Sequence, residues 1–84
     1  MNEIRRKRVL YRSVNRGCKE TDILVGRFAE ANIWQLSEEE VVNLEKFLEE
    51  GDNDIYNWLT GQSETPEEYT DICTKIISYT RDAA

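Results

Sequence analysis

The chain has 84 residues, the length of one small domain, and a formal charge of −6 from 11 basic and 17 acidic residues. With 39% hydrophobic and 33% charged residues, the composition suits a folded domain and excludes a disordered chain. The sequence contains no histidine, which excludes Ser-His and Cys-His nucleophile pairs and imidazole metal ligands. A domain this small has little room for both a core and a deep active-site cavity.

Apolar residues recur along the chain at spacings of three and four, without a sustained alternation of two, which predicts helices throughout. In the first predicted helix, Ile4, Tyr11 and Val14 share one side with Leu10 beside them, and we expect this side to contribute to the core. The helix is expected to end near Gly17, because glycine readily adopts the left-handed conformation that closes a helix.

The second predicted helix follows directly and ends near Asn32. Its apolar face is formed by Ile23, Leu24, Phe28 and Ala31. The third predicted helix has the clearest start, because Ser37 and Glu40 have the spacing of a capping box, in which each side chain accepts a hydrogen bond from the other residue's backbone N–H. Its buried stripe is formed by Val41, Leu44, Phe47 and Leu48. Gly51 is expected to stop it.

Two further helices are predicted in the second half of the chain. Asp52 is expected to cap a short fourth helix that Gly61 stops and that carries Ile55, Tyr56, Trp58 and Leu59. Thr65 and Glu68 predict a second capping box, with Pro66 at the first helical position. The residues of the fifth helix expected to face inward are Tyr69, Ile72, Cys73 and Ile76.

These elements predict an all-α fold, a compact bundle of about five short antiparallel helices that forms a single domain over residues 1–84. No apolar run approaches the roughly 20 residues that span a bilayer, so we expect no membrane span. Carboxylates at positions 38–40 suit the first turn of a helix, and the acidic residues at 52–54 lack the further ligands of a calcium loop. We therefore expect no metal site.

Positive charge is concentrated at the start of the chain. Residues 1–20 have a net charge of +5, and residues 21–84 have a net charge of −11. Two interpretations remain open: a basic helix that lies on an acidic body, and a positive face that is offered to a partner. Nucleic acid is a poor partner for the whole domain because most of its surface would repel phosphates. The basic first helix by itself could still bind nucleic acid, so a small nucleic-acid-binding regulator is the alternative function.

The corner between the first two predicted helices combines distinctive groups. Arg16 offers planar, bidentate donors, Glu20 offers a carboxylate, and Gly17 allows another chain to approach the backbone closely. Capping and helix-dipole effects explain the same residues generically, since cations suit helix C-termini and acidic residues suit first turns. The corner also suits recognition of a protein. A redox role for Cys18 is a lesser hypothesis because no catalytic base accompanies it.

The five residues Arg16-Gly17-Cys18-Lys19-Glu20 match the Arg-Gly-x-x-Glu motif of the succinate dehydrogenase FAD-assembly factors, which are small helical proteins of bacteria and mitochondria. Residues 52–59 resemble the second signature of that family, Asp-x-Asp-apolar-x-x-Trp-Leu. Both motifs occur in the family's order, and the resemblance covers about residues 5–77. Thr21 departs from the family pattern, because many members carry an apolar residue there.

The resemblance implies an assembly factor and not an enzyme. Such a factor binds the flavoprotein subunit of succinate dehydrogenase, and in some bacteria that of fumarate reductase, and promotes covalent attachment of FAD to a histidine of that partner. No cofactor is then expected to stay bound to the chain itself. The predicted partner-binding residues are Arg16, Gly17 and Glu20, with Arg12, Lys19 and Asp22 beside them.

The likeness and the small core also favour a monomer that forms a heterodimer with its partner. We expect it in the bacterial cytoplasm rather than the mitochondrial matrix, because the basic start of the sequence leads directly into patterned, foldable sequence, unlike a transit peptide. Some members of the family are described as antitoxins, so an antitoxin-like regulator stands with the nucleic-acid-binding alternative.

Overall fold

The chain folds into short helices around one apolar core. The computed structural model describes residues 3–14 and 19–83. Regular structure in these residues consists of five α-helices and one short 3-10 helix: α1 (Glu3–Val14), α2 (Lys19–Asn32), α3 (Glu38–Phe47), α4 (Asp52–Leu59), η1 (Glu67–Tyr69) and α5 (Thr70–Ala83). The described residues contain no strand, and the all-α class with about five helices is confirmed.

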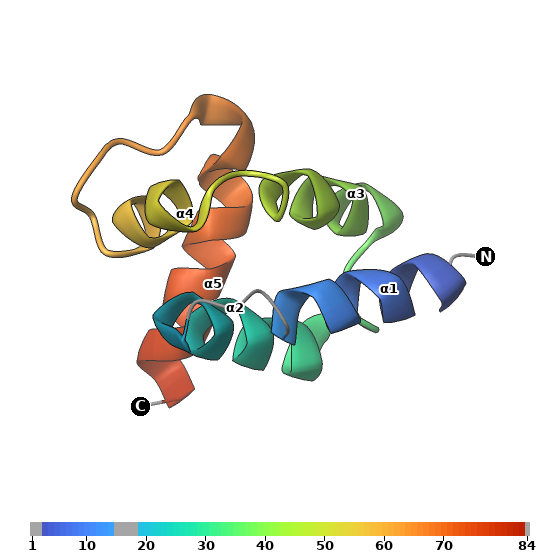
Figure 1. Cartoon of the computed structure of the whole chain (residues 1–84). Coiled ribbons are helices and arrows are strands. Elements are labelled where there is room, and N and C mark those ends of the chain that lie inside the picture. The colour runs from blue at the N-terminus through green and yellow to red at the C-terminus, as the bar shows by residue number, and fades with distance from the viewer. Residues whose placement is uncertain (1–2, 15–18, 84) are drawn as a thin grey trace.

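The helices are arranged around two pairs of neighbours. α1 and α2 lie side by side and run in opposite directions, while α3 and α4 follow one another on the other side of the core (Figure 1). α5 crosses these elements and packs against α2, α3 and α4. The Cα radius of gyration is 11.7 Å, close to the value of about 12 Å for a compact domain of this length. No helix in the described part of the chain is long and apolar enough to cross a bilayer.

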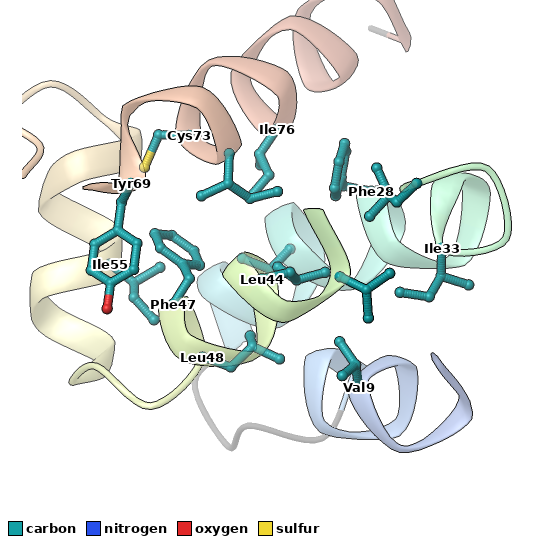
Figure 2. Packing of buried hydrophobic residues seen from close by; sticks show 14 of the residues in the cluster. Val9, Phe28, Ile33, Leu44, Phe47, Leu48, Ile55, Tyr69, Cys73 and Ile76 are labelled. Atoms are coloured by element: carbon teal, nitrogen blue, oxygen red, sulfur yellow. The ribbon is translucent and has the colours of Figure 1, made fainter. Parts of the chain in front are cut away.

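Every helix contributes to the core. Its buried apolar residues are Val9, Val25, Phe28, Ile33, Leu36, Val41, Leu44, Phe47, Leu48, Ile55, Leu59, Tyr69, Ile72, Cys73 and Ile76. Phe47 lies between α4 and the start of α5, with its ring centroid 5.4 Å from that of Tyr69 (Figure 2). The predicted inward residues of α3 and α5 are confirmed, because all of them are buried.

The start of α3 is confirmed as a capping box. The backbone N–H of Glu40 donates to Ser37 Oγ at 3.1 Å, and the backbone N–H of Ser37 donates to Glu40 Oε1 at 2.8 Å. The other carboxylate oxygen of Glu40 lies 3.2 Å from Lys75 Nζ on α5. The Ser37 N–H is the main cause that holds the pKa of Glu40 below its ordinary value, and the Lys75 ammonium adds to the effect. This carboxylate therefore caps one helix and ties it to another.

Glu40→Gln is expected to lower the free energy of unfolding at pH 7 by less than about 1 kcal/mol, because the amide keeps the capping bond and loses the charge. Folding depresses the pKa of this carboxyl, so its charge stabilises the protein above the unfolded value of 4.5 and this contribution is lost as the pH falls below it. Urea unfolding of wild type and variant should differ at pH 7 and converge towards about pH 3. A difference that persists at low pH would contradict the electrostatic origin.

The predicted inward side of the first helix is only partly correct, because Leu10, which packs against the core, and Val14 are half-buried. Val9 and Ser13 are fully buried, whereas Ile4 and Tyr11 are 79% and 68% exposed. Ser13 Oγ donates to the carbonyl of Val9 at 2.8 Å, which satisfies the hydroxyl inside the contact between helices. Ser13 and Val14 lie against Gly26 of α2, whereas Ile4 and Tyr11 remain at the surface.

The predicted apolar face of α2 is only partly correct. Phe28 is buried and the half-buried Leu24 packs against the core. Ile23, however, is 43% exposed and Ala31 is exposed. α2 contacts α1 on one side and α4 and α5 on the other, so its buried surface is turned relative to the stripe that spacing alone predicts.

The boundaries of α4 differ by one residue from the prediction. Gly51 occupies the N-cap position without a side-chain hydrogen bond, and Asp52 is the first helical residue. The carboxylate of Asp52 is therefore placed in the first turn, where the helix dipole favours negative charge. Gly61 follows the helix with φ +79°, which confirms that it stops α4 through the left-handed conformation.

The predicted second capping box does not form. Pro66 is instead the N-cap of η1, with no side-chain capping bond from this position. The backbone N–H of Tyr69 donates to the carbonyl of Pro66 at 2.9 Å, which is the three-residue spacing of a 3-10 helix. This tighter turn brings Tyr69 onto Phe47 before the α-helix begins. Tertiary contact with an aromatic neighbour thus prevails over the local capping signal.

Candidate functional site

The two helices that flank residues 15–18 are held closely together. A Cβ built at Gly26 of α2 would lie 3.2 Å from Val14 Cγ1 and 3.5 Å from the carbonyl oxygen of Ser13. Gly26 therefore allows the end of α1 to approach the backbone of α2. Thr21 in the first turn of α2 is fully buried, so the residue that departs from the family pattern is part of the interior. The resulting scaffold is close-packed at the base of the connection.

Two of the predicted partner-binding residues lie on the described ends of these helices. Arg12 is half-buried in the last turn of α1, and Glu20 is exposed in the first turn of α2. Only residues 15–18 separate the two helices. Because α1 and α2 are antiparallel neighbours, Arg12 and Glu20 lie at the same end of the pair.

The structure describes less of the other four predicted residues. Lys19 and Asp22 belong to the first turn of α2, where their backbone positions alone are described. Arg16 and Gly17 lie outside the described residues, as does Cys18. The contact role of these residues stays a prediction that mutagenesis can test.

Three basic residues in the first half of α1 contact other elements of the protein. Arg5 Nε lies 3.5 Å and Arg8 Nη2 lies 3.4 Å from the carboxylate of Glu45 on α3. Arg6 Nη1 donates to the carbonyl of Ile33 in the turn after α2. The interpretation as a basic helix on an acidic body agrees with these contacts. The nucleic-acid-binding alternative has no support from this geometry, and the cluster is part of the folded domain.

The second signature, residues 52–59, coincides with α4 and has a packing role. Ile55 is fully buried in the core. Trp58 is half-buried, with its ring centroid 6.0 Å from Phe47 and 5.6 Å from Tyr69. The aromatic and apolar positions of this signature therefore attach α4 to α3 and to the start of α5.

Two titratable groups in the core are held in their neutral forms. Burial, and then the carboxylate of Glu50, which accepts a hydrogen bond from the Tyr69 hydroxyl at 2.8 Å, together raise the pKa of Tyr69 to about 12. Burial also raises the pKa of the Cys73 thiol, which is free and 3% exposed. A thiol in this setting is a poor nucleophile, because the thiolate is the reactive form. Within the described residues, no group of three or more acidic or cysteine side chains is placed to hold a metal ion.

Two structural features, the close approach at Gly26 and the exposed Trp34, were not predicted from the sequence. Gly26 was detectable, because an isolated glycine in a helical pattern usually has a packing reason. Trp34, 53% exposed in the turn between α2 and α3, had no local signal that separates a surface tryptophan from a core tryptophan. Exposure of this kind depends on where distant helices pack.

Comparison with known proteins finds a matching family model and relatives that are named as assembly factors. A family model described as "Flavinator of succinate dehydrogenase" matches residues 7–80. The chain is 38% identical over 74 residues to "Succinate dehydrogenase assembly factor 2, mitochondrial" of Dictyostelium discoideum, and this alignment covers 88% of this chain and 52% of that protein. It is 44% identical over 64 residues to "FAD assembly factor SdhE" of Acetobacter pasteurianus, and this alignment covers 76% of this chain and 59% of that protein.

A third relative has a similar level of identity. The chain is 40% identical over 63 residues to "Succinate dehydrogenase assembly factor 2, mitochondrial" of Lodderomyces elongisporus, which covers 75% of this chain and 38% of that protein. The chain spans between 38% and 59% of the length of these three relatives. The family model, by contrast, covers both sequence motifs and most of this chain. The resemblance carried by those motifs is confirmed, and the chain belongs to the family described as "Flavinator of succinate dehydrogenase".

Proposed function

We propose that this chain is an assembly factor that binds the flavoprotein subunit of succinate dehydrogenase and promotes the covalent attachment of FAD to that subunit. The observation that carries the proposal is the family match over residues 7–80, which includes the Arg-Gly-x-x-Glu sequence at positions 16–20. Relatives named as a succinate dehydrogenase assembly factor and as an FAD assembly factor support the same activity.

The geometry suggests how such a factor works. The half-buried Arg12 and the exposed Glu20 lie on the ends of α1 and α2 that flank residues 15–18, and these two helices pack closely at Gly26. In the proposed mechanism this corner binds the partner in the conformation in which FAD attachment proceeds, and the reacting groups belong to the partner and its flavin. A 100-fold preference for that conformation, about 2.7 kcal/mol, raises its population from about 1% to about half.

The proposed assembly is one copy of this chain with one copy of the flavoprotein subunit, in the bacterial cytoplasm. A continuous core supports a chain that folds before it binds. The molar mass of the purified mixture, measured by light scattering, tests the one-to-one assembly, and fractionation of the host cell tests the compartment.

Arg16→Ala is expected to reduce covalent flavinylation roughly tenfold or more when the factor is limiting, because removal of a bidentate arginine from a contact surface costs about 2 kcal/mol. The flavoprotein subunit of the same host is expressed without the factor, with the wild type and with the variant. Covalent flavin is then read as fluorescence on a denaturing gel.

Lys7→Ala is the matched control. Lys7 is also a basic residue of the pair formed by α1 and α2. Its side chain, however, is 65% exposed and pairs with Glu3 near the start of α1, at the other end from residues 15–18. Flavinylation with Lys7→Ala should equal that with the wild type. Equal flavinylation with and without the wild-type factor would overturn the proposed function.

A further inference from the structure

An apolar hollow is lined by residues of α2, α4 and α5. Leu24 of α2, Leu59 of α4 and Ile76 of α5 form its apolar floor, and the last two are almost fully buried. Ile77, which is 39% exposed, and the exposed Arg81 stand at its rim on α5. An apolar floor with an isoleucine at its edge is the surface chemistry of a protein contact.

The size of the hollow decides between a small molecule and a protein side chain. Its volume is about 190 Å³. Pockets that enclose drug-sized ligands and cofactors have volumes of about 300–1,000 Å³. The hollow is too small for a dinucleotide and suits a single large apolar side chain that projects from another polypeptide.

Glu20, one of the predicted partner-binding residues, shares a face of α2 with Leu24 of the hollow. Glu20, Ile23, Leu24 and Arg27 follow one another on α2 at spacings of three and four, so they share one face of that helix. Glu20 and Arg27 are exposed, and Ile23 is 43% exposed. A partner that contacts Glu20 therefore meets the hollow along the same helix face.

Charge at the rim indicates which residues accompany the apolar side chain. Residues 21–84 contain four basic residues against fifteen acidic ones. One of the four, Arg81, lines the hollow, and a second, Arg27, lies on the face of α2 that contains Leu24. No ion pair among the described side chains involves either of them. Lys75, by comparison, pairs with Glu40 at 3.2 Å. Two cations on an otherwise acidic surface are complementary to a carboxylate of a partner.

We propose that the hollow receives one large apolar side chain from the flavoprotein subunit, with an acidic residue of the same segment placed against Arg81. This inference rests on the proposed function and adds a second anchor to the corner at positions 16–20. The division of roles follows from the chemistry of the two places: the corner provides charged groups, and the hollow provides a desolvated apolar contact of the kind that dominates binding energy.

Ile77→Glu tests the hollow, with Ile4→Glu as its matched control. Both substitutions introduce the same charge at an exposed isoleucine, but Ile4 lies near the start of α1, away from α5 (Figure 1). Binding to the purified flavoprotein subunit of the same host is measured by isothermal titration calorimetry, and thermal unfolding checks that both variants fold. We expect Kd to rise at least tenfold for Ile77→Glu and less than twofold for Ile4→Glu.

Photo-cross-linking separates failure of this inference from failure of the proposed function. A p-benzoylphenylalanine is placed at position 77 or at position 20, and cross-linked peptides of the subunit are identified by mass spectrometry. We expect both positions to cross-link, and the peptide from position 77 to contain a large apolar residue beside an acidic one. Charge exchange between Arg81→Glu and a lysine at that acidic position should restore binding.

Three outcomes would overturn the inference. A cross-link from position 20 without one from position 77, together with unchanged Kd for Ile77→Glu, would reject the hollow and leave the proposed function standing. A cross-link from position 77 to a second copy of this chain would assign the hollow to self-association. If the wild type neither binds the subunit nor cross-links from either position, both the inference and the proposed function fail.

Discussion

Phe47→Ala is expected to lower the free energy of unfolding by about 3–5 kcal/mol, the usual cost of truncating a buried aromatic residue. Phe47 is 0% exposed, and its ring centroid lies 5.4 Å from that of Tyr69 and 6.0 Å from that of Trp58. The truncation leaves a cavity where α3, α4 and η1 meet. A domain of this length is stable by about 4–13 kcal/mol in total, so the loss is a large share of its stability.

Urea unfolding followed by circular dichroism measures this loss. Phe47→Leu keeps most of the apolar volume and should lose less than half as much stability as Phe47→Ala. Ile4→Ala, at a side chain that is 79% exposed, should change the free energy of unfolding by about 0.5 kcal/mol or less. A loss below about 1.5 kcal/mol for Phe47→Ala would contradict its central position in the core.

Gly26→Leu is expected to abolish flavinylation, because it forces α1 away from α2 and displaces the corner that the two helices support. The position of a Cβ at Gly26 is already 3.2 Å from Val14 Cγ1, so the larger side chain has no space between the helices. Overpacking of this kind costs about 1–3 kcal/mol. Flavinylation and hydrogen exchange of the α1 amides measure the functional and the structural effect separately.

Gly51→Ala is the control for this substitution. A Cβ at Gly51 would come no closer than 3.8 Å to Asp54 Oδ2, an ordinary contact, so the added methyl group has space. Restoration of flavinylation by Gly26→Ala combined with Val14→Ala would confirm that the side-chain clash is the cause. Full flavinylation by Gly26→Leu, with unchanged exchange in α1, would contradict the dependence of the corner on this contact.

The sensitivity expected at Gly26 follows from how little of α1 is buried. Val9 and Ser13 are its fully buried residues. The ion pairs of Arg5 and Arg8 with Glu45 lie at a partly exposed surface, where such pairs contribute up to about 1 kcal/mol each. The position of α1, and with it one side of the partner-binding corner, therefore depends strongly on its close approach to α2.

The sequence alone determined the features that arise within a few neighbouring residues. The box formed by Ser37 and Glu40 starts α3 as predicted, because both groups lie within one turn. Gly61 ends α4 as predicted because a left-handed residue suits glycine in any context. The inward stripes of α3 and α5 follow from helical periodicity. The two short motifs also pointed to the family, because they were recognisable without coordinates.

Only the tertiary structure decided which surfaces face one another. Val9 and Ser13, not Ile4 and Tyr11, became the fully buried residues of α1, because Val9 meets the core cluster and the end of the helix at Ser13 and Val14 meets α2 at Gly26. The apolar hollow combines side chains of α2, α4 and α5, which lie far apart in the sequence. Local spacing states which residues share a helix face, but burial depends on the helices that pack against that face, and this information exists only once distant segments meet.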